Sequence, residues 1–142
     1  MQIGIRSAGE RAAREFVSDQ GGKIYTAREL CGKDGDALQS VIHEVRARMD
    51  KAGNPPCYLT FDIDALDPAF APGTGTPEVG GLTTAQAMTL LEAWHDLNWV
   101  GMDCTEVSPP YDHAELTSNA AAVIVWTWLC GSIYANSSVA RK

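Results

Sequence analysis

The sequence predicts an α/β domain built on a mostly parallel sheet, and two observations support this prediction. Short strand-like apolar runs alternate along the chain with segments whose apolar residues have helical spacing, and parallel strands joined by helical crossovers produce that order. The chain also contains no internal repeat, linker or low-complexity stretch, so its 142 residues are expected to form one domain around one core.

The N-terminal part of the chain contains short strand signals and one clear helix. Residues 1–6 alternate as a strand, residues 10–17 have a helical pattern, and residues 23–25 are a second short strand. A stronger helix is predicted over 36–52, where Asp36 can cap the first turn. Its apolar stripe consists of Leu38, Val41, Ile42, Val45 and Met49.

The middle of the chain contains a strand, a long loop and a helix. Residues 57–62 form an apolar strand, and a loop rich in proline and glycine follows over 65–82. Thr83 and Gln86 make a capping box for the next helix. The apolar positions of that helix are Met88, Leu91, Trp94 and Leu97.

The C-terminal part contains a strand over 99–105 and a last helix. Asp112 and Glu115 are placed to open this helix, which is apolar on most faces from 120 to 133. Its longest apolar run is about half the ~20 residues that a membrane span needs, so we expect a buried helix and no membrane contact. The tryptophans are all expected at core-like positions: Trp94, Trp99, Trp126 and Trp128.

Composition excludes several classes of protein. A net charge of -7 argues against nucleic-acid binding, which needs clustered lysine and arginine. The four cysteines form no C-x-x-C pair, so neither a disulfide framework nor a structural zinc site is expected, and a reducing cytoplasm is the predicted location.

Two carboxylates follow the apolar strand at 57–62. If the strand continued, Asp62 and Asp64 would point to the same side, and their mutual repulsion would favour binding of a hard divalent cation. The alternative is structural, because aspartates at such positions often cap backbone N–H groups of the following turn. The residue pattern alone leaves both interpretations open.

The residues around this pair carry a family resemblance. From Phe61 to Thr83 the chain reads F-D-I-D-A-L-D-P-A-F-A-P-G-T-G-T-P-E-V-G-G-L-T, which resembles the signature of the arginase/agmatinase (ureohydrolase) family. The A-P-G-T-G-T-P form is more similar to agmatinases than to arginases. The resemblance implies that Asp62 bridges two Mn²⁺ ions, that Asp64 binds one of them, and that the metal pair activates a water for catalysis. Asp67, with Pro68, is expected to shape the turn and not to bind metal.

A second segment extends the resemblance. Residues 101–109, G-M-D-C-T-E-V-S-P, are similar to the family pattern G-x-D-x-x-E-x-x-P, which implies that Glu106 holds the guanidinium of the substrate. A planar guanidinium suits a bidentate carboxylate. From the residues alone, a surface glutamate or a salt bridge to a helix is the favoured explanation. Asp103 is expected to be structural, and no histidine is assigned a catalytic role.

The resemblance spans residues 1–142 and implies a three-layer α/β/α fold that corresponds to the C-terminal half of a family member. The family's remaining metal ligands lie in G-G-D-H and D-A-H-x-D segments, and neither occurs in this sequence. Two of six implied ligands are present. The chain is then a fragment of an enzyme, one subunit of a split or self-paired assembly, or a degenerate relative. The resemblance also implies a homo-oligomer, because members of the family commonly form homo-oligomers.

The expected function follows from this resemblance. The leading hypothesis is Mn²⁺-dependent hydrolysis of a cationic guanidino substrate, foremost agmatine to putrescine and urea, which would require the missing ligands. Alternative substrates are 4-guanidinobutyrate and other linear amidines. A different class of function is a non-catalytic assembly subunit that uses the fold to pair with another chain.

Overall fold

The computed structural model describes residues 1–7, 9–30 and 35–137, and it confirms the predicted alternation of strands and helices. The predicted cap at Asp36 lies outside the described side chains. The elements are β1 (Gln2–Ile5), α1 (Arg11–Asp19), β2 (Ile24–Thr26), α2 (Ala27–Leu30), α3 (Gly35–Lys51), β3 (Cys57–Asp62), η1 (Ile63–Ala65), α4 (Thr84–Ala93), β4 (Trp99–Thr105), η2 (Pro109–Tyr111), η3 (His113–Glu115) and α5 (Leu116–Asn136).

The strands form two parallel pairs. β1 pairs with β2 from Gln2↔Ile24 onward, and β3 pairs with β4 from Cys57↔Trp99 to Asp62↔Thr105. Within the part of the chain that the structure describes, no ladder joins β1 to β3. The sheet is therefore parallel, as predicted, but it is divided in its middle.

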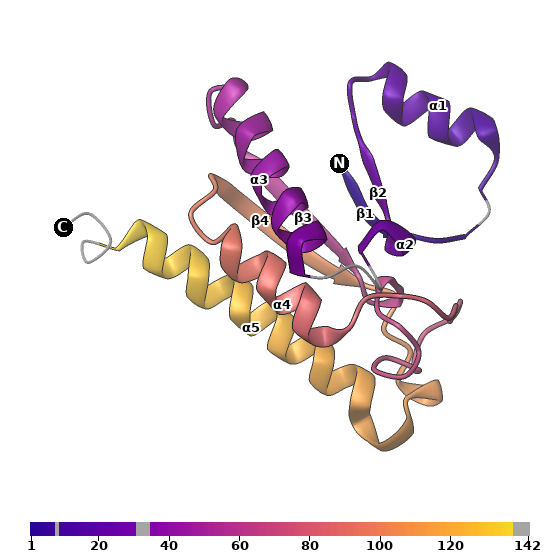
Figure 1. The fold of residues 1–142 in the computed structure, drawn as a ribbon. Coiled ribbons are helices and arrows are strands. Elements are labelled where there is room, and N and C mark those ends of the chain that lie inside the picture. The colour runs from indigo at the N-terminus through magenta and orange to yellow at the C-terminus, as the bar shows by residue number, and fades with distance from the viewer. Residues whose placement is uncertain (8, 31–34, 138–142) are drawn as a thin grey trace.

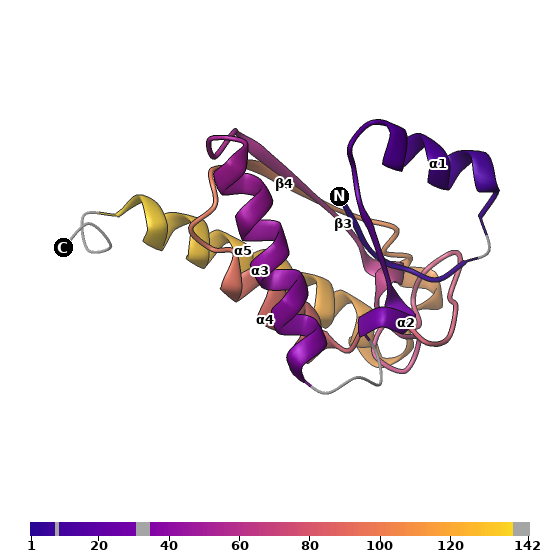
Figure 2. The ribbon, with the colours of Figure 1, turned by 45° about the horizontal axis from the view of Figure 1, so that its top comes forward.

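Most of the helices lie beside one of the two strand pairs. In Figures 1 and 2, α3, α4 and α5 lie together beside β3 and β4, whereas α1 lies apart from them beside β1 and β2. α1 is the crossover between the parallel strands β1 and β2, and α4 is the crossover between the parallel strands β3 and β4. The chain thus has the α/β architecture.

The core lies between the β3–β4 pair and the helices α3, α4 and α5. Apolar side chains on one face of that pair, such as Leu59 and Phe61, pack against buried residues of the helices. Ile63, Leu66 and Ile124 are at most 1% exposed, so the segment that follows β3 is anchored in this core. Anchoring of this kind fixes the position of Asp62 and Asp64, which flank Ile63.

Helix α4 begins with the predicted capping box. The Gln86 N–H donates to Thr83 Oγ1 (3.1 Å), and the Thr83 N–H donates to Gln86 Oε1 (2.9 Å), so two of the free N–H groups of the first turn are satisfied. The helix ends at Ala93, earlier than the predicted apolar pattern, which ran to Leu97.

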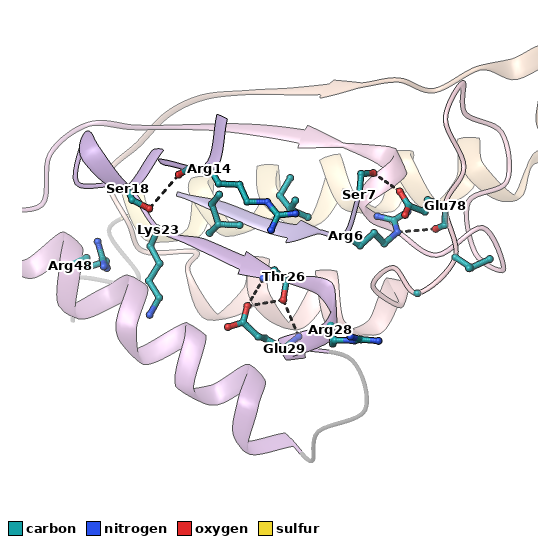
Figure 3. Close-up of a pocket in the computed structure, with 15 residues that line it drawn as sticks. Arg6, Ser7, Arg14, Ser18, Lys23, Thr26, Arg28, Glu29, Arg48 and Glu78 are labelled. Atoms are coloured by element: carbon teal, nitrogen blue, oxygen red, sulfur yellow. Dashed lines mark hydrogen bonds between the residues drawn. The ribbon is translucent and has the colours of Figure 1, made fainter. Parts of the chain in front are cut away.

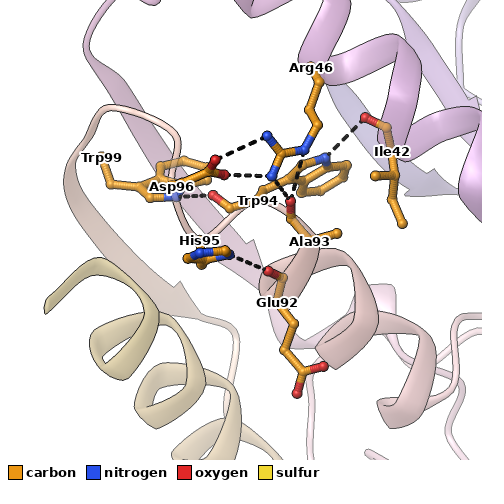
Figure 4. A network of polar contacts seen from close by, with 8 residues as sticks. All are labelled: Ile42, Arg46, Glu92, Ala93, Trp94, His95, Asp96 and Trp99. Atoms are coloured by element: carbon orange, nitrogen blue, oxygen red, sulfur yellow. Dashed lines mark hydrogen bonds and ion pairs between the residues drawn. The ribbon is translucent and has the colours of Figure 1, made fainter. Parts of the chain in front are cut away.

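A polar network at the end of α4 joins it to α3 and β4 (Figure 4). Arg46 of α3 forms an ion pair with Asp96 (2.5 Å) and donates to the carbonyl of Ala93. The indole of Trp94 donates to Ile42 O (3.4 Å), and the indole of Trp99 donates to Trp94 O (2.8 Å). These bonds replace the last helical turn that the sequence pattern predicted.

Helix α5 corrects two predictions. It was expected to be buried, but Thr117 and Ile124 are its buried residues among those described, and Trp126 and Ile133 are each 67% exposed. Trp126 is therefore not a core residue. The physical reason is that α5 packs on α4 along one face, while its other face is uncovered by the residues that the structure describes. By length and composition alone, the helical stretch over 113–136 could cross a membrane. One such helix is weak evidence for a membrane span, so the expected absence of membrane contact stays a prediction.

One buried hydrogen bond links α5 to the long loop. The Gly73 N–H donates to Thr117 Oγ1 (2.7 Å), and the Thr117 side chain is 0% exposed. We predict that Thr117→Val lowers the free energy of unfolding by about 1–3 kcal/mol. Valine has the same shape as threonine but no hydroxyl, so the buried N–H of Gly73 loses its hydrogen-bond partner. Urea denaturation measures the effect. Thr89→Val, which removes only a bond to the carbonyl one turn earlier, is the control and should cost less than about 0.5 kcal/mol.

Candidate active site

Asp62 lies at the end of β3 and caps the turn that follows. Its Oδ1 accepts a hydrogen bond from the Asp64 N–H (3.1 Å), which starts the 3₁₀ turn η1. Asp64 is therefore in a turn, and the prediction that strand alternation aligns the two carboxylates is wrong. The structural alternative, in which an aspartate caps a backbone N–H of the following turn, is observed at Asp62. Ile63, between them, is buried in the core.

The position of Asp64 is fixed by contacts from two distant segments. Thr76 Oγ1 donates to Asp64 Oδ2 (2.8 Å), which ties the carboxylate to the long loop. Arg6, which follows β1, donates to the carbonyls of Asp64 (2.5 Å) and Leu66 (3.3 Å). Its Nε also donates to Glu78 O (2.8 Å), as Figure 3 shows.

Arg6 is a residue of the site region that sequence reasoning missed. One guanidinium holds both the turn after β3 and the far end of the long loop, so β1 is joined to the carboxylate segment through a side chain. The available signal was its position immediately after the first strand, because side chains at the carboxyl ends of parallel strands meet at one edge. That signal gave no indication of which carbonyls it would bind.

Glu106 follows β4 directly and adopts a left-handed backbone, with φ of 64°. The register pairs Thr105 with Asp62, so the glutamate leaves its strand next to the aspartate. A Cβ placed on Gly75 would lie 3.9 Å from Glu106 Oε2, so the long loop also borders this side chain. The structure thus brings Glu106, Asp62 and Asp64 to the same end of the sheet.

The electrostatics of Asp62 reflect this convergence. Burial raises the pKa of its carboxyl above the ordinary value, and the charges of Asp64 and Glu106 raise this pKa further. The hydrogen bond from the Asp64 N–H acts in the opposite direction and is outweighed. Three carboxylates therefore lie close enough to repel one another, which is an arrangement that a cation would stabilise.

These side chains fit a hard metal ion only as part of a larger ligand set. Carboxylate oxygens are suitable ligands for Mn²⁺, and a divalent ion would relieve the repulsion at Asp62. Within residues 1–7, 9–30 and 35–137, however, no group of three or more His, Cys, Asp or Glu side chains is arranged to hold a metal. Asp62 and Asp64 can supply two ligands, and further ligands have to come from other residues.

Asp67 and Asp103 have structural contacts. The carboxylate of Asp67 accepts hydrogen bonds from the N–H groups of Ala69 (2.9 Å), Gly80 (2.7 Å) and Gly81 (3.2 Å), and these bonds, foremost the one from Ala69, lower its pKa. Asp67 therefore closes the long loop on itself, in the turn-shaping role that the sequence suggested. Asp103 accepts a bond from the Tyr58 hydroxyl (3.2 Å) on the face of β4 that the helices leave uncovered.

Asp112 caps helix α5 next to the site. Burial alone would raise the pKa of its carboxyl, but bonds from the Ser118 hydroxyl and from the N–H groups of Thr117 and Ser118 prevail and lower it to about 2. The sequence placed this residue correctly at the start of the last helix, although Glu115, its predicted companion, has a left-handed backbone and forms no such cap.

This cap predicts a pH dependence of stability. A lowered pKa in the folded state means that Asp112 stabilises the protein above the unfolded-state value of roughly 4 and loses this contribution as the pH falls through about 2. We expect the melting temperature to fall across that window, and to fall less steeply in Asp112→Asn, which is already a few degrees less stable at pH 7. Thermal melts between pH 2 and 7 test this. Equal slopes for both proteins in that window would contradict the assignment.

Among the described residues, three cavities lie near the site, and none is lined by all three carboxylates. One, of about 440 Å³, is lined by Asp62 and Asp64 but not by Glu106. A second, of about 410 Å³, is lined by residues that include Asp64, Thr76 and Arg6. A larger one, of about 1070 Å³, lies between α1 and β2 and includes neither Asp62 nor Glu106. The acidic cluster thus occupies an open end of the sheet, and the described residues do not enclose it.

Comparison with known proteins identifies the family. The model of the arginase family matches residues 1–131. The chain belongs to the arginase family. It is 47% identical over 124 residues to an agmatinase of Escherichia coli, a match that covers 87% of this chain and 36% of the relative.

Solved structures of arginase-family proteins show the same fold. The proclavaminate amidino hydrolase of Streptomyces clavuligerus matches with a TM-score of 0.79 and 38% identity, over 94% of this chain and 42% of that one. A hypothetical agmatinase from Burkholderia thailandensis matches with a TM-score of 0.75 and 37% identity, over 92% and 37%. The chain therefore spans about two fifths of the length of these arginase-family proteins.

Proposed function

We propose that this chain contributes to the hydrolysis of a guanidino compound, with agmatine as the leading substrate and urea and putrescine as the products. The observation that carries the proposal is the convergence of Asp62, Asp64 and Glu106 at one end of the sheet, where the latter two charges raise the pKa of the first. Membership of the arginase family and 47% identity to an agmatinase support the choice of reaction and substrate.

In this proposal Asp62 and Asp64 hold Mn²⁺ together with ligands from outside the chain. When bound, the metal supplies a nucleophile from water at neutral pH and stabilises negative charge on the reacting group. Asp64 is kept in place by Thr76 and, through its backbone, by Arg6. Asp62 is held by its own bond to the Asp64 N–H. The two carboxylates are thus preorganised, which limits the reorganisation that metal binding would require.

Glu106 is proposed to bind the guanidinium. Its two oxygens can accept a pair of parallel N–H bonds from a planar cation, which fixes the orientation of the carbon that is attacked. Its position beside Asp62 places the cation next to the metal ligands. The overall charge of -7 is compatible with a cationic substrate.

The experiment supplies the part of the enzyme that the chain does not span. The chain is produced together with the unmatched remainder of the Escherichia coli agmatinase, purified as a complex, and assayed for urea release with and without Mn²⁺. Agmatine, 4-guanidinobutyrate and arginine form the substrate panel. We expect Mn²⁺-dependent release, fastest with agmatine.

The second candidate function, a non-catalytic assembly subunit, is favoured by one observation, the exposed apolar face of α5. A complex that binds Mn²⁺ but releases urea from none of the three compounds would reject the catalytic proposal and support this one. The Glu106→Gln variant separates substrate binding from metal binding. It should raise KM for agmatine by roughly tenfold or more, because it removes the charge that pairs with the guanidinium, and leave the bound Mn²⁺ unchanged.

A further inference from the structure

The cavity of about 1070 Å³ between α1 and β2 concentrates positive charge in an acidic protein. Five of the chain's 11 lysine and arginine residues line it, but only two of its 18 aspartate and glutamate residues do. The lining therefore has an excess of positive charge, whereas the whole chain has a net charge of -7. We call it the basic cavity, and its charged residues are Arg6, Arg14, Lys23, Arg28, Arg48, Glu29 and Glu78.

Separate segments of the chain bring the five cations of the basic cavity together. Arg14 belongs to α1, Arg28 to α2 and Arg48 to the last turn of α3, while Arg6 follows β1 and Lys23 precedes β2. Figure 3 shows the Arg14 side chain extending from α1 across the strands, with Lys23 and Arg48 at one end of the cavity and Arg6 at the other. Like charges that converge in this way repel one another, and an anion between them would remove the repulsion.

Three of the cations are not neutralised by a carboxylate that the structure describes. Neither Arg14 nor Arg28 forms an ion pair with another described residue. Arg6 donates to the backbone carbonyls of Asp64 (2.5 Å) and Glu78 (2.8 Å), which carry no formal charge. The guanidinium groups of α1 and α2 are also exposed, so they are accessible to a ligand.

The other two cations share one carboxylate. Glu44, which lies beside the cavity, pairs with Lys23 Nζ (2.6 Å) and Arg48 Nε (3.4 Å), so these three side chains together keep one positive charge. The hydrogen bond from Lys23 to Glu44 raises the pKa of the lysine, which keeps the amine protonated at neutral pH. Both cationic side chains remain 39% exposed, so Glu44 does not shield them from the cavity.

We propose that the basic cavity binds a small polyanion that carries phosphate or carboxylate groups. The planar guanidinium groups of Arg14 and Arg28 present parallel N–H donors, which match two oxygens of either group. A volume of about 1070 Å³ is larger than one such group needs and is comparable to sites for small organic molecules, so a ligand with two or more anionic groups fits it. The site is distinct from the acidic cluster, because Asp62, Asp64 and Glu106 do not line it.

Calorimetric titration of the 142-residue chain with pyrophosphate and, separately, with citrate tests the proposal. At about 0.15 M NaCl, where diffuse surface attraction is screened, we expect at least one of them to bind with Kd of about 1 mM or tighter. The tighter of the two ligands identifies phosphate or carboxylate as the group recognised. Arg14→Gln and Arg28→Gln should each raise Kd by about tenfold or more, because each removes a charge-assisted pair.

Arg11→Gln is the matched control for Arg14→Gln. It makes the same change on the same helix, but Arg11 pairs with Glu15 (2.5 Å) and does not line the cavity. Its Kd should lie within about twofold of that of the unsubstituted chain. Amide chemical shifts locate the ligand, since those of Ser18, Gly22 and Thr26 should move and that of Gly101 in β4 should not.

Three results would overturn the proposal. The first is a Kd weaker than about 10 mM for both ligands. The second is an equal loss of affinity in Arg11→Gln and Arg14→Gln, which would show attraction to the surface as a whole. The third is a set of shift changes confined to residues outside the basic cavity. The titrations contain neither Mn²⁺ nor agmatine, so their outcome is independent of the proposed activity.

Discussion

Asp62→Asn in the complemented protein is expected to lower kcat/KM for agmatine by roughly a thousandfold or more. The substitution keeps the size of the side chain and an oxygen that can still accept the Asp64 N–H bond, so the turn η1 should persist. It removes the negative charge that lies beside Asp64 and Glu106. Urea release at saturating Mn²⁺ and the Mn²⁺ content of the purified complex are the two measurements.

The control for this variant is Asp50→Asn, which makes the same chemical change at an exposed position in the last turn of α3. It should leave urea release within about twofold of the unsubstituted protein, since exposed substitutions away from special features have small effects. If Asp62→Asn retained full activity and a full complement of Mn²⁺, the proposed metal-binding role of this residue would be wrong.

Gly73→Ala is expected to lower the free energy of unfolding by about 2–6 kcal/mol. The new Cβ would lie 2.6 Å from Asp112 Cβ, 2.7 Å from Asp112 Cα and 2.9 Å from Thr117 Oγ1. Because one of these atoms is backbone, either the loop or the start of α5 has to move, which costs about 1–3 kcal/mol. The movement also breaks the buried bond from the Gly73 N–H to Thr117, which adds a comparable cost.

Gly9→Ala is the matched control, because a Cβ at that position has no atom within 4 Å and its φ is not positive. Its stability should lie within about 0.5 kcal/mol of the unsubstituted protein. Urea denaturation of both variants gives the comparison. A Gly73→Ala protein as stable as the Gly9→Ala protein would show that the loop and α5 are not packed as described.

The sequence predicted the elements that depend on local pattern. The strands at 57–62 and 99–105 were predicted with their observed bounds, because a short apolar run between turn residues is a local signal. The capping box of α4 was also predicted correctly, since both of its members lie within one turn. The convergence of Asp62 and Glu106 obeys the rule that the strand ends of a parallel sheet share an edge, because the register pairs Asp62 with Thr105.

The features that the sequence did not predict depend on distant contacts. Asp64 was expected on a continuing strand, but one hydrogen bond to Asp62 favours a turn, and residue alternation does not report such a choice. Burial of α5 was inferred from its apolar composition, yet burial depends on a covering surface, and the described residues leave Trp126 67% exposed. The division between β1 and β3 depends on strand order, which the pattern of a single sequence does not determine.

The backbone of Glu106 has a consequence for attempts to stabilise this protein. A left-handed φ costs a residue with a side chain roughly 1 kcal/mol or more, and glycine avoids most of this cost. A library screened only for heat resistance should therefore enrich Gly at position 106 and discard the carboxylate. Selection for urea release should restore Glu there. Thermostability and catalysis thus impose opposite preferences at one position, and a stabilised version of the protein has to hold residue 106 constant.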